Sequence, residues 1–202
     1  MTYLLVKEHS YEEEIKKSRF IAIAAPAQSA EQALAWIHER SDPAARHNCW
    51  AFKVGEQYRF SDDGEPGGTA GRPILQAIDG QNCDFVAVLV IRWFGGIKLG
   101  TGGLVRAYGG VAAECLRQAQ KEKYVPTVAA SGFCPYAEIE RVKAQFEDFQ
   151  VTVREEQFGA DGVDWVLALP EKKLGAFSLR IQNMTRGEGW LKAMVNDSAD
   201  AD

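Results

Sequence analysis

The sequence predicts an α+β protein of two domains, which we place at residues 1–126 and residues 127–202. The chain has 202 residues, and 46% of them are hydrophobic, as expected for globular domains with proper cores. A charged run, Gln120–Lys123, closes a long helical pattern, and a new apolar run follows Pro126. Charge also changes there: 15 basic and 15 acidic residues precede the boundary, and 8 basic and 13 acidic residues follow it.

The first domain is expected to combine strands with three helices. The expected strands cover residues 3–6, 19–25, 47–54, 58–61 and 84–93, and the expected helices cover residues 29–40, 70–79 and 101–121. Ser29 and Gln32 form a capping box at the start of the first helix. Residues 10–17 have charge pairs at helical spacing, but this short segment lies between strands and favours an extended hairpin. The run 85–91 is rich in β-branched residues, which predicts a strand buried on both faces.

The second domain has a simpler order of elements. Strands are expected at residues 128–135, 151–158, 163–169 and 189–195, and helices at residues 137–149 and 171–183. The order β-α-β-β-α-β is that of the ferredoxin-like split unit. Residues 198–202 are expected to form a frayed tail.

Composition excludes several classes of protein. No segment approaches the ~20 apolar residues of a membrane span, so no membrane association is expected. Met1–Ser10 lacks the pattern of a secretory signal, and the four widely spaced cysteines are typical of reduced core residues, so we expect a cytoplasmic protein. The net charge of −5 argues against wrapping of nucleic acid by the whole chain, but leaves room for a local basic patch.

The first stretch that could carry chemistry is Ser61–Pro73. It places three carboxylates, Asp62, Asp63 and Glu65, within four positions. Carboxylates this close repel one another, so they need protons, a cation or backbone N–H donors. One interpretation is a Mg²⁺ site or a general acid–base site. We expect the protein to require no cofactor, with Mg²⁺ as a candidate cation at this site. The other is a turn that closes with Thr69 as the N-cap of the next helix.

The second stretch, residues 92–106, runs from a buried strand through a glycine-rich loop to a helix start. Free N–H groups and the positive end of the helix dipole make such a junction an anion site. The candidate phosphate-binding residues here are Arg92, Lys98, Gly100, Thr101, Gly102, Gly103 and Arg106. Trp93 and Phe94 could stack on bases. The alternative is that the glycines allow tight packing and the two aromatic residues belong to the core.

Known phosphate-binding motifs do not fit this loop. A P-loop would need lysine where Thr101 follows Gly100, and the dinucleotide fingerprint would need glycine where Val105 stands.

Two further residues join the candidate ligand site. Arg72 begins the helix that follows the acidic loop, and His47 shares one strand face with Cys49. A Cys–His nucleophile or metal pair is conceivable, although a core role for Cys49 is favoured.

Several of these segments together resemble the IMPACT family, in its YigZ-like bacterial branch. The matching motifs are Ile15–Ile21, Ala45–Cys49, Phe60–Pro66, Gly68–Pro73 and Gly95–Tyr108. The resemblance extends from about Lys16 to Val195. Gly67 stands where an alanine is frequent in the family.

The resemblance implies a first domain with the fold of the second domain of ribosomal protein S-five, and a ferredoxin-like second domain. That pairing is similar to domains four and five of elongation factor G, which work on the ribosome. Eukaryotic members regulate translation by competing for an activator of a starvation-sensing kinase. They have an extra N-terminal domain that we do not expect in this chain, so their role is not transferred. For the bacterial branch, the resemblance implies RNA or ribosome association without an assigned reaction.

Three functions remain open from the sequence. The leading hypothesis is a non-enzymatic RNA- or ribosome-associated protein linked to translation or its regulation. The second is a Mg²⁺-dependent enzyme that binds a phosphorylated small molecule or nucleotide. The third is a protein-interaction adaptor that docks partners on its acidic second domain.

Overall fold

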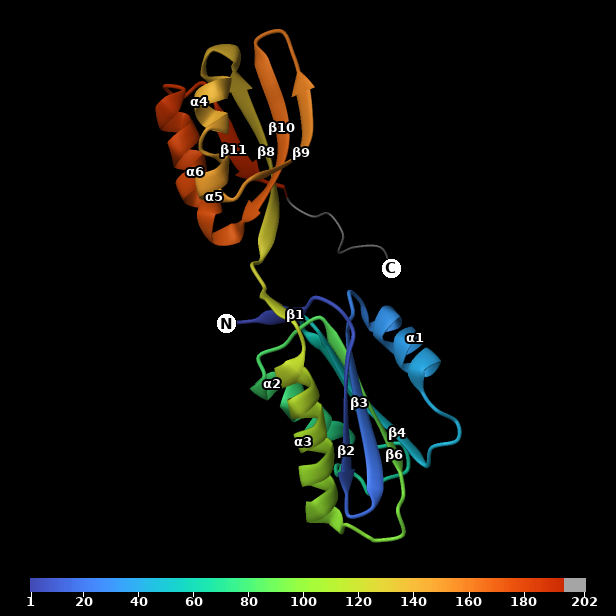
Figure 1. Cartoon of the computed structure of the whole chain (residues 1–202). Helices are drawn as coiled ribbons and strands as arrows, with labels where there is room; N and C mark the ends of the chain where they lie inside the picture. The colour runs from blue at the N-terminus through green and yellow to red at the C-terminus, as the bar shows by residue number, and fades with distance from the viewer. Residues whose placement is uncertain (195–202) are drawn as a thin grey trace. The chain divides into compact units, whose positions relative to one another are not determined.

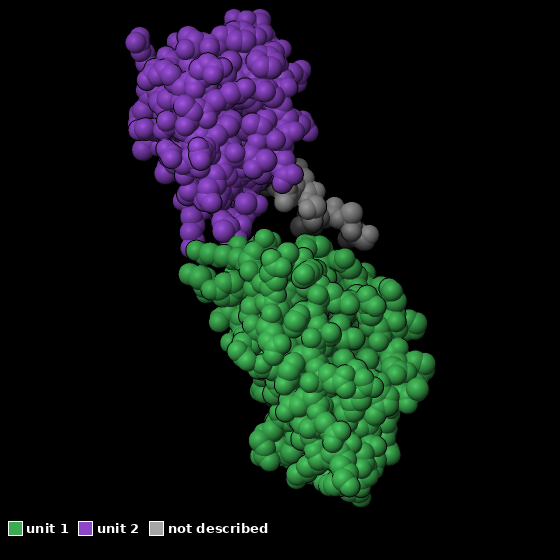
Figure 2. Space-filling model, in the orientation of Figure 1, with its two compact units in different colours: residues 1–124 green, residues 125–202 purple. Residues whose placement is uncertain are grey.

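The computed structural model describes residues 1–194. The chain divides into two compact units, residues 1–124 and residues 125–202 (Figure 2). Within the described residues, no helix combines the length and the apolar character that a membrane crossing requires. This division into two units, each of which combines helices with strands, confirms the two-domain α+β architecture predicted from the sequence.

Unit 1 is a three-layer arrangement around an antiparallel sheet. Its strands are β1 (Tyr3–Leu5), β2 (His9–Ile15), β3 (Ser18–Pro26), β4 (His47–Val54), β5 (Gln57–Ser61), β6 (Val86–Trp93) and β7 (Lys121–Lys123), and its helices are α1 (Ala30–Arg40), α2 (Gly71–Gly80) and α3 (Thr101–Gln118). The main sheet has the order β2-β3-β6-β4-β5. Helices α2 and α3 pack on one face and α1 on the other (Figure 1). Strand β6 is central and buried on both faces, as its apolar run predicted.

The segment 10–17 is extended, as the sequence analysis favoured. Strand β2 pairs with β3 from His9↔Ala24 to Ile15↔Ser18. Lys16 and Lys17 form the connecting turn, with φ angles of 48° and 65°. Positive φ at both central residues is the geometry of a type I′ hairpin turn, which usually selects asparagine or glycine. Two lysines therefore form the tip of this hairpin at a conformational cost.

The end of α3 differs from the prediction. The helix stops at Gln118 rather than at residue 121, and Lys121–Lys123 forms β7. This strand pairs with β1, from Tyr3↔Lys123 to Leu5↔Lys121. The main-chain hydrogen bonds of that pairing outweigh the helix propensity of a charged run, which is a weak local preference.

Unit 2 has the ferredoxin-like order predicted from the sequence. Its elements are β8 (Thr127–Pro135), a 3₁₀ turn (Tyr136–Glu138), α4 (Ile139–Lys143), α5 (Phe146–Phe149), β9 (Thr152–Phe158), β10 (Gly162–Pro170), α6 (Glu171–Met184) and β11 (Trp190–Ala193). The sheet has the order β11-β8-β10-β9, and the helices cover one of its faces (Figure 1). The core contains Trp165, which is 2% exposed.

The first helical segment of unit 2 is interrupted where one helix was expected over residues 137–149. The break brings Phe146 and Phe149 onto Phe177, with ring centroids 6.0 and 4.7 Å apart. Packing of these rings outweighs the continuity of a helix. The last strand ends at Ala193 rather than at residue 195, and the tail predicted for residues 198–202 lies outside the described residues.

Candidate functional site

A pocket of about 370 Å³ opens at one end of unit 1, where four segments meet. These segments are the start of β4, the acidic loop after β5, the end of β6 and the junction of the glycine-rich loop with α3. The pocket is lined by Arg46, His47, Gly64, Glu65, Pro66, Arg92, Phe94, Lys98, Leu99, Gly100, Thr101 and Leu104. Its volume lies in the range of small-molecule sites, which is roughly 300–1,000 Å³.

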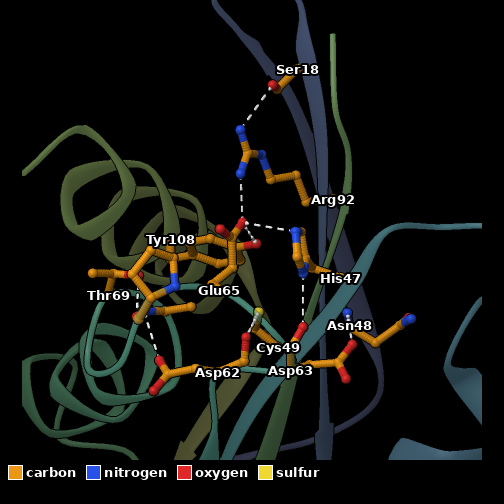
Figure 3. A network of polar contacts seen from close by, with 12 residues as sticks. Ser18, His47, Asn48, Cys49, Asp62, Asp63, Glu65, Thr69, Arg92 and Tyr108 are labelled. Carbon is orange, nitrogen blue, oxygen red and sulfur yellow. Dashed lines mark hydrogen bonds and ion pairs between the residues drawn. The ribbon is translucent and has the colours of Figure 1, made fainter. Parts of the chain in front are cut away.

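Glu65 lies at the centre of a buried polar network beside this pocket (Figure 3). Its Oε1 accepts hydrogen bonds from Arg92 Nη1 at 2.5 Å and from the Tyr108 hydroxyl at 2.8 Å. The side chains of Arg92 and Glu65 are only 5% and 4% exposed. A carboxylate this deeply buried is stable as an ion only when it is paired and hydrogen-bonded, and both conditions are met.

Tyr108 remains a proton donor in this network. Burial strongly raises the pKa of its phenol, and the neighbouring Cys49 and Glu65 raise it further. Its ring meets Phe20 edge to face, with centroids 5.3 Å apart. The hydroxyl is thus protonated at physiological pH and held by packing in line with the carboxylate.

His47 connects the network to the acidic loop. Its Nδ1 lies 2.7 Å from the carbonyl oxygen of Asp63, so Nδ1 carries the proton and donates to that oxygen. The other ring nitrogen, Nε2, lies 3.8 Å from Glu65 Oε1. His47 can therefore accept a proton at Nε2 on the pocket wall, or pair with Glu65 when both nitrogens are protonated.

Arg92 does not have the role expected from the sequence. We expected it to add free charge to the glycine-rich loop, yet its guanidinium neutralises Glu65 and donates to Ser18 Oγ at 3.3 Å. The guanidinium also lies 5.4 Å from the Phe20 ring centroid and 5.6 Å from that of Phe94. Because the residue is almost fully buried, its charge must be paired inside the protein.

The three carboxylates of the acidic loop have separate partners. Asp62 accepts from the backbone N–H groups of Gly68, Ala70 and Gly71 at 2.8, 2.9 and 2.8 Å. Burial acts to raise the pKa of Asp62, but these three donors outweigh it and hold that pKa below its ordinary value. Asp63 accepts from the backbone N–H of Asn48 at 2.5 Å.

Backbone and side-chain donors therefore offset the repulsion that suggested a cation. Residues 1–194 contain no cluster of three or more His, Cys, Asp or Glu side chains that could hold a metal ion. Asp62, Asp63 and Glu65, suggested as a shared Mg²⁺ site, are thus not gathered into one such cluster in the described residues.

Two further expectations for this region are resolved. Thr69 is not the N-cap of α2: Ala70 occupies that position, Asp62 supplies the cap, and the Thr69 hydroxyl donates to Pro66 O at 2.6 Å. Cys49 is a core residue, and burial raises the pKa of its thiol to about 12. A thiol with that pKa stays protonated at neutral pH, which favours the core role for Cys49 over that of a nucleophile.

The start of α3 has the features of an anion site. Gly100 is the N-cap at φ 75°, with no side-chain cap. The first helical hydrogen bond runs from Leu104 N to Gly100 O, so the N–H groups of Thr101, Gly102 and Gly103 have no helical acceptor. These groups and the helix dipole favour negative charge at the pocket mouth.

Gly95 serves packing rather than ligand approach. A Cβ at this position would lie 1.7 Å from Lys17 O, so the glycine-rich loop lies directly against the tip of the β2–β3 hairpin. Of the two aromatic residues before it, Phe94 is 39% exposed and lines the pocket, whereas Trp93 is half-buried with the Arg19 guanidinium 4.9 Å from its ring centroid.

The candidate ligand-binding residues are only partly brought together. The pocket is lined by His47, Arg92, Lys98, Gly100 and Thr101. Gly102, Gly103 and Arg106 lie just outside it, on the first turns of α3. Arg72 lies elsewhere, in a groove between α2 and β5.

Sequence reasoning missed several residues at this end of unit 1. Arg46 lines the pocket next to His47, and its position beside that candidate residue in the sequence could have indicated it. Lys16 and Lys17 lie at this end because they form the turn between β2 and β3. The strand patterns on either side of the two lysines predict that turn. Tyr108 lies in α3, and nothing local to it in the sequence links its hydroxyl to Glu65.

Comparisons with known proteins cover both units. The chain matches the model of the Impact N-terminal domain over residues 16–116 and that of a domain of unknown function, DUF1949, over residues 133–188. It is similar to a Thermus thermophilus "IMPACT family member in pol 5'region", at 46% identity over 179 residues that cover 88% of this chain and 99% of the relative. It is also similar to the Escherichia coli (strain K12) "IMPACT family member YigZ", at 37% identity over 189 residues that cover 90% and 92%.

A solved structure agrees with these matches. A crystal structure described as that of a hypothetical protein has a TM-score of 0.67 and 34% identity, and the match covers 97% of this chain and 98% of that one. At this level of identity and coverage the assignment is direct: the chain belongs to the IMPACT family.

Proposed function

We propose that this chain is a non-enzymatic RNA- or ribosome-associated protein linked to translation or its regulation. The observation that carries the proposal is a group of exposed cations at the pocket end of unit 1, which we call the cationic end. It consists of Lys16, Lys17, Arg46, Lys98 and Arg106. The hairpin tip and the β6–α3 loop lie together there (Figure 1).

The charges of the cationic end are free to meet phosphates. Within residues 1–194, none of its five side chains takes part in an ion pair. Two carboxylates of the acidic loop have partners of their own, since Glu65 pairs with Arg92 and Asp63 accepts from Asn48 N. Lys and Arg contacts to backbone phosphates supply most of the affinity of sequence-independent nucleic-acid binding.

Two further features suit an RNA ligand. Phe94 and Ile97 on the β6–α3 loop are 39% and 42% exposed, and an exposed aromatic ring can stack on an unpaired base. The uncapped start of α3 supplies N–H donors for a phosphate beside Lys98. Membership of the IMPACT family, with its resemblance to ribosome-acting domains, supports a link to translation.

The proposal is tested by the fluorescence anisotropy of a labelled single-stranded RNA titrated with the full chain across a salt series. We expect log K to fall linearly with log salt. We also expect the double variant Lys98→Ala with Arg106→Ala to bind more weakly and to reduce the slope by about 1.4, because each phosphate contact contributes roughly 0.7. The matched control is Lys7→Ala with Lys123→Ala, which removes two exposed cations outside this end. Equal binding by the two double variants would reject the cationic end as the contact surface.

An enzyme acting on a phosphorylated small molecule or nucleotide is the second candidate. The observation that favours it is the pocket of about 370 Å³, with His47 Nε2 near the buried Glu65 carboxylate and the start of α3 at its mouth. In this version His47 transfers a proton while the helix start holds the phosphate. Its test is thermal stabilisation by nucleotides with and without Mg²⁺. No shift under either condition would eliminate it.

A further inference from the structure

A second concave surface of unit 1 lies between α2 and the edge strand β5. It is lined by Lys53, Tyr58, Phe60, Arg72, Leu75, Gln76 and Asp79. Tyr58 and Phe60 are 61% and 42% exposed, which is unusual for two aromatic residues on the same face of a strand. We call this surface the β5 groove. It uses a different set of residues from the pocket beside Glu65.

The main chain of β5 offers free hydrogen-bonding groups at the groove. The connection Gly55-Glu56 makes Val54 and Gln57 the last hydrogen-bonded pair of the β4–β5 hairpin. Hydrogen-bonded pairs alternate along an antiparallel ladder, so the N–H and C=O groups of Tyr58 and Phe60 point away from β4. Strand β5 is the last strand of its sheet, and no turn, loop or cap hydrogen bond reaches these two residues within residues 1–194.

The charge of the groove selects for an acidic occupant. Lys53 and Asp79 neutralise each other, with Lys53 Nζ 2.7 Å from Asp79 Oδ1. Arg72 is exposed and forms no ion pair within the described residues, so it leaves one uncompensated positive charge beside the aromatic pair. An extended segment with apolar side chains and a carboxylate would match the strand edge, the aromatic surface and this arginine together.

We propose that the β5 groove binds an extended acidic segment of a partner protein, which adds as an extra strand to the edge of β5. Main-chain hydrogen bonds to Tyr58 and Phe60 provide affinity, as in other cases of β-strand addition. Alternate side chains of the segment pack on the two aromatic rings, and an acidic side chain pairs with Arg72. The groove gives this protein a docking surface on unit 1, in addition to its proposed RNA contact.

In the first experiment, a displayed library of linear peptides of about ten residues is selected for binding to the full chain. The selected peptides are then synthesised, and their affinity for the full chain is measured. We expect alternating apolar residues with at least one acidic residue. We expect the Arg72→Glu variant to weaken binding by at least about tenfold, because it sets like charges against each other. The matched control Arg59→Glu reverses a charge on the opposite face of the same strand and is expected to leave affinity unchanged.

Two further measurements separate strand addition from other modes of binding. On peptide binding, hydrogen exchange is expected to slow at the amides of Tyr58 and Phe60, and N-methylation of alternate peptide residues is expected to abolish binding. The Lys98→Ala with Arg106→Ala variant should bind peptide normally, so a failure of the RNA proposal leaves this test intact.

Three outcomes would overturn the inference. The first is the absence of selected peptides that bind the purified chain. The second is peptide binding that is indifferent to both Arg72→Glu and N-methylation. The third is dimerisation in analytical ultracentrifugation that Tyr58→Thr abolishes, which would assign the edge of β5 to a second copy of this chain.

Discussion

The ion pair between Glu65 and Arg92 gives the sharpest prediction about stability. Both side chains are about one-twentieth exposed, and the nitrogen and oxygen lie 2.5 Å apart. Replacing Glu65 by alanine leaves the guanidinium buried without its counter-ion and deprives the Tyr108 hydroxyl of its acceptor. We expect the free energy of unfolding to fall by about 3–5 kcal/mol, the usual cost of removing one partner of a buried pair.

An exposed ion pair in the same unit serves as the matched control. Arg19 and Glu12 also lie in close contact, at 2.6 Å, but their side chains are 51% and 54% exposed. We expect Glu12→Ala to cost less than about 1 kcal/mol, because solvent screens the pair and holding it costs side-chain entropy. The difference between the two alanine variants isolates the effect of burial from that of charge removal.

A double-mutant cycle then separates the pair from its surroundings. Arg92→Met removes the cation and keeps most of the side-chain volume, but it leaves the carboxylate buried without its partner. Adding Glu65→Gln removes that charge, so we expect the double variant to be more stable than Arg92→Met alone. The coupling free energy is expected to be about 1–3 kcal/mol.

The assay has to report on unit 1 alone. Trp36, Trp50 and Trp93 lie in unit 1, whereas Trp165 and Trp190 lie in unit 2, so tryptophan fluorescence mixes the two unfolding transitions. Native-state hydrogen exchange of the β6 amides measures the opening of unit 1 directly. Equal losses for Glu65→Ala and Glu12→Ala, or additive effects in the cycle, would refute the reasoning from burial.

Three further predictions concern the same region. Tyr108→Phe keeps the ring packing but loses a hydrogen bond to a charged acceptor, and should cost about 1.5–3 kcal/mol in the same hydrogen-exchange measurement on β6. Gly95→Ala places a Cβ 1.7 Å from Lys17 O and should destabilise unit 1. Gly110→Ala in α3 meets nothing within 4 Å and should stabilise unit 1 by up to about 1 kcal/mol. Equal effects of the two variants would refute the close packing of Gly95 on the hairpin tip. The folded pKa of Asp62 lies below its ordinary value of 3.8, so its stabilisation is present above that pH and is lost as pH falls through the folded pKa. Asp62→Asn should therefore lose stability less steeply than the wild type below about pH 4 in acid titrations followed by circular dichroism, and equal slopes would contradict the role of the three backbone donors.

Local patterns predicted most of the elements because pattern and packing agree in them. The apolar run of β6 specified a central strand, and Ser29 specified the start of α1, where its Oγ accepts from Gln32 N at 3.2 Å. The predictions that were wrong depended on distant partners. Strand β7 exists because β1 pairs with it, and the helix after β8 breaks because Phe146 and Phe149 pack on α6.

The candidate site was predictable as a region but not as a set of roles. Its glycine-rich loop and helix start follow from the sequence, and so does the place of His47 at the edge of β4. The sequence does not reveal that Arg92 neutralises Glu65, because the two residues are 27 positions apart and meet only when β6 packs beside the acidic loop. It equally hides the separation of Arg72 from the other cations, which depends on the side of α2 that faces β5.

The most direct test of the central claim is co-sedimentation of the full chain with ribosomes and with free RNA across a salt series. We expect co-sedimentation that weakens as salt rises and that is lost in the Lys98→Ala with Arg106→Ala variant at salt concentrations where the Lys7→Ala with Lys123→Ala control still binds. No co-sedimentation at any salt concentration, or co-sedimentation that is equal in the two double variants, would contradict the account.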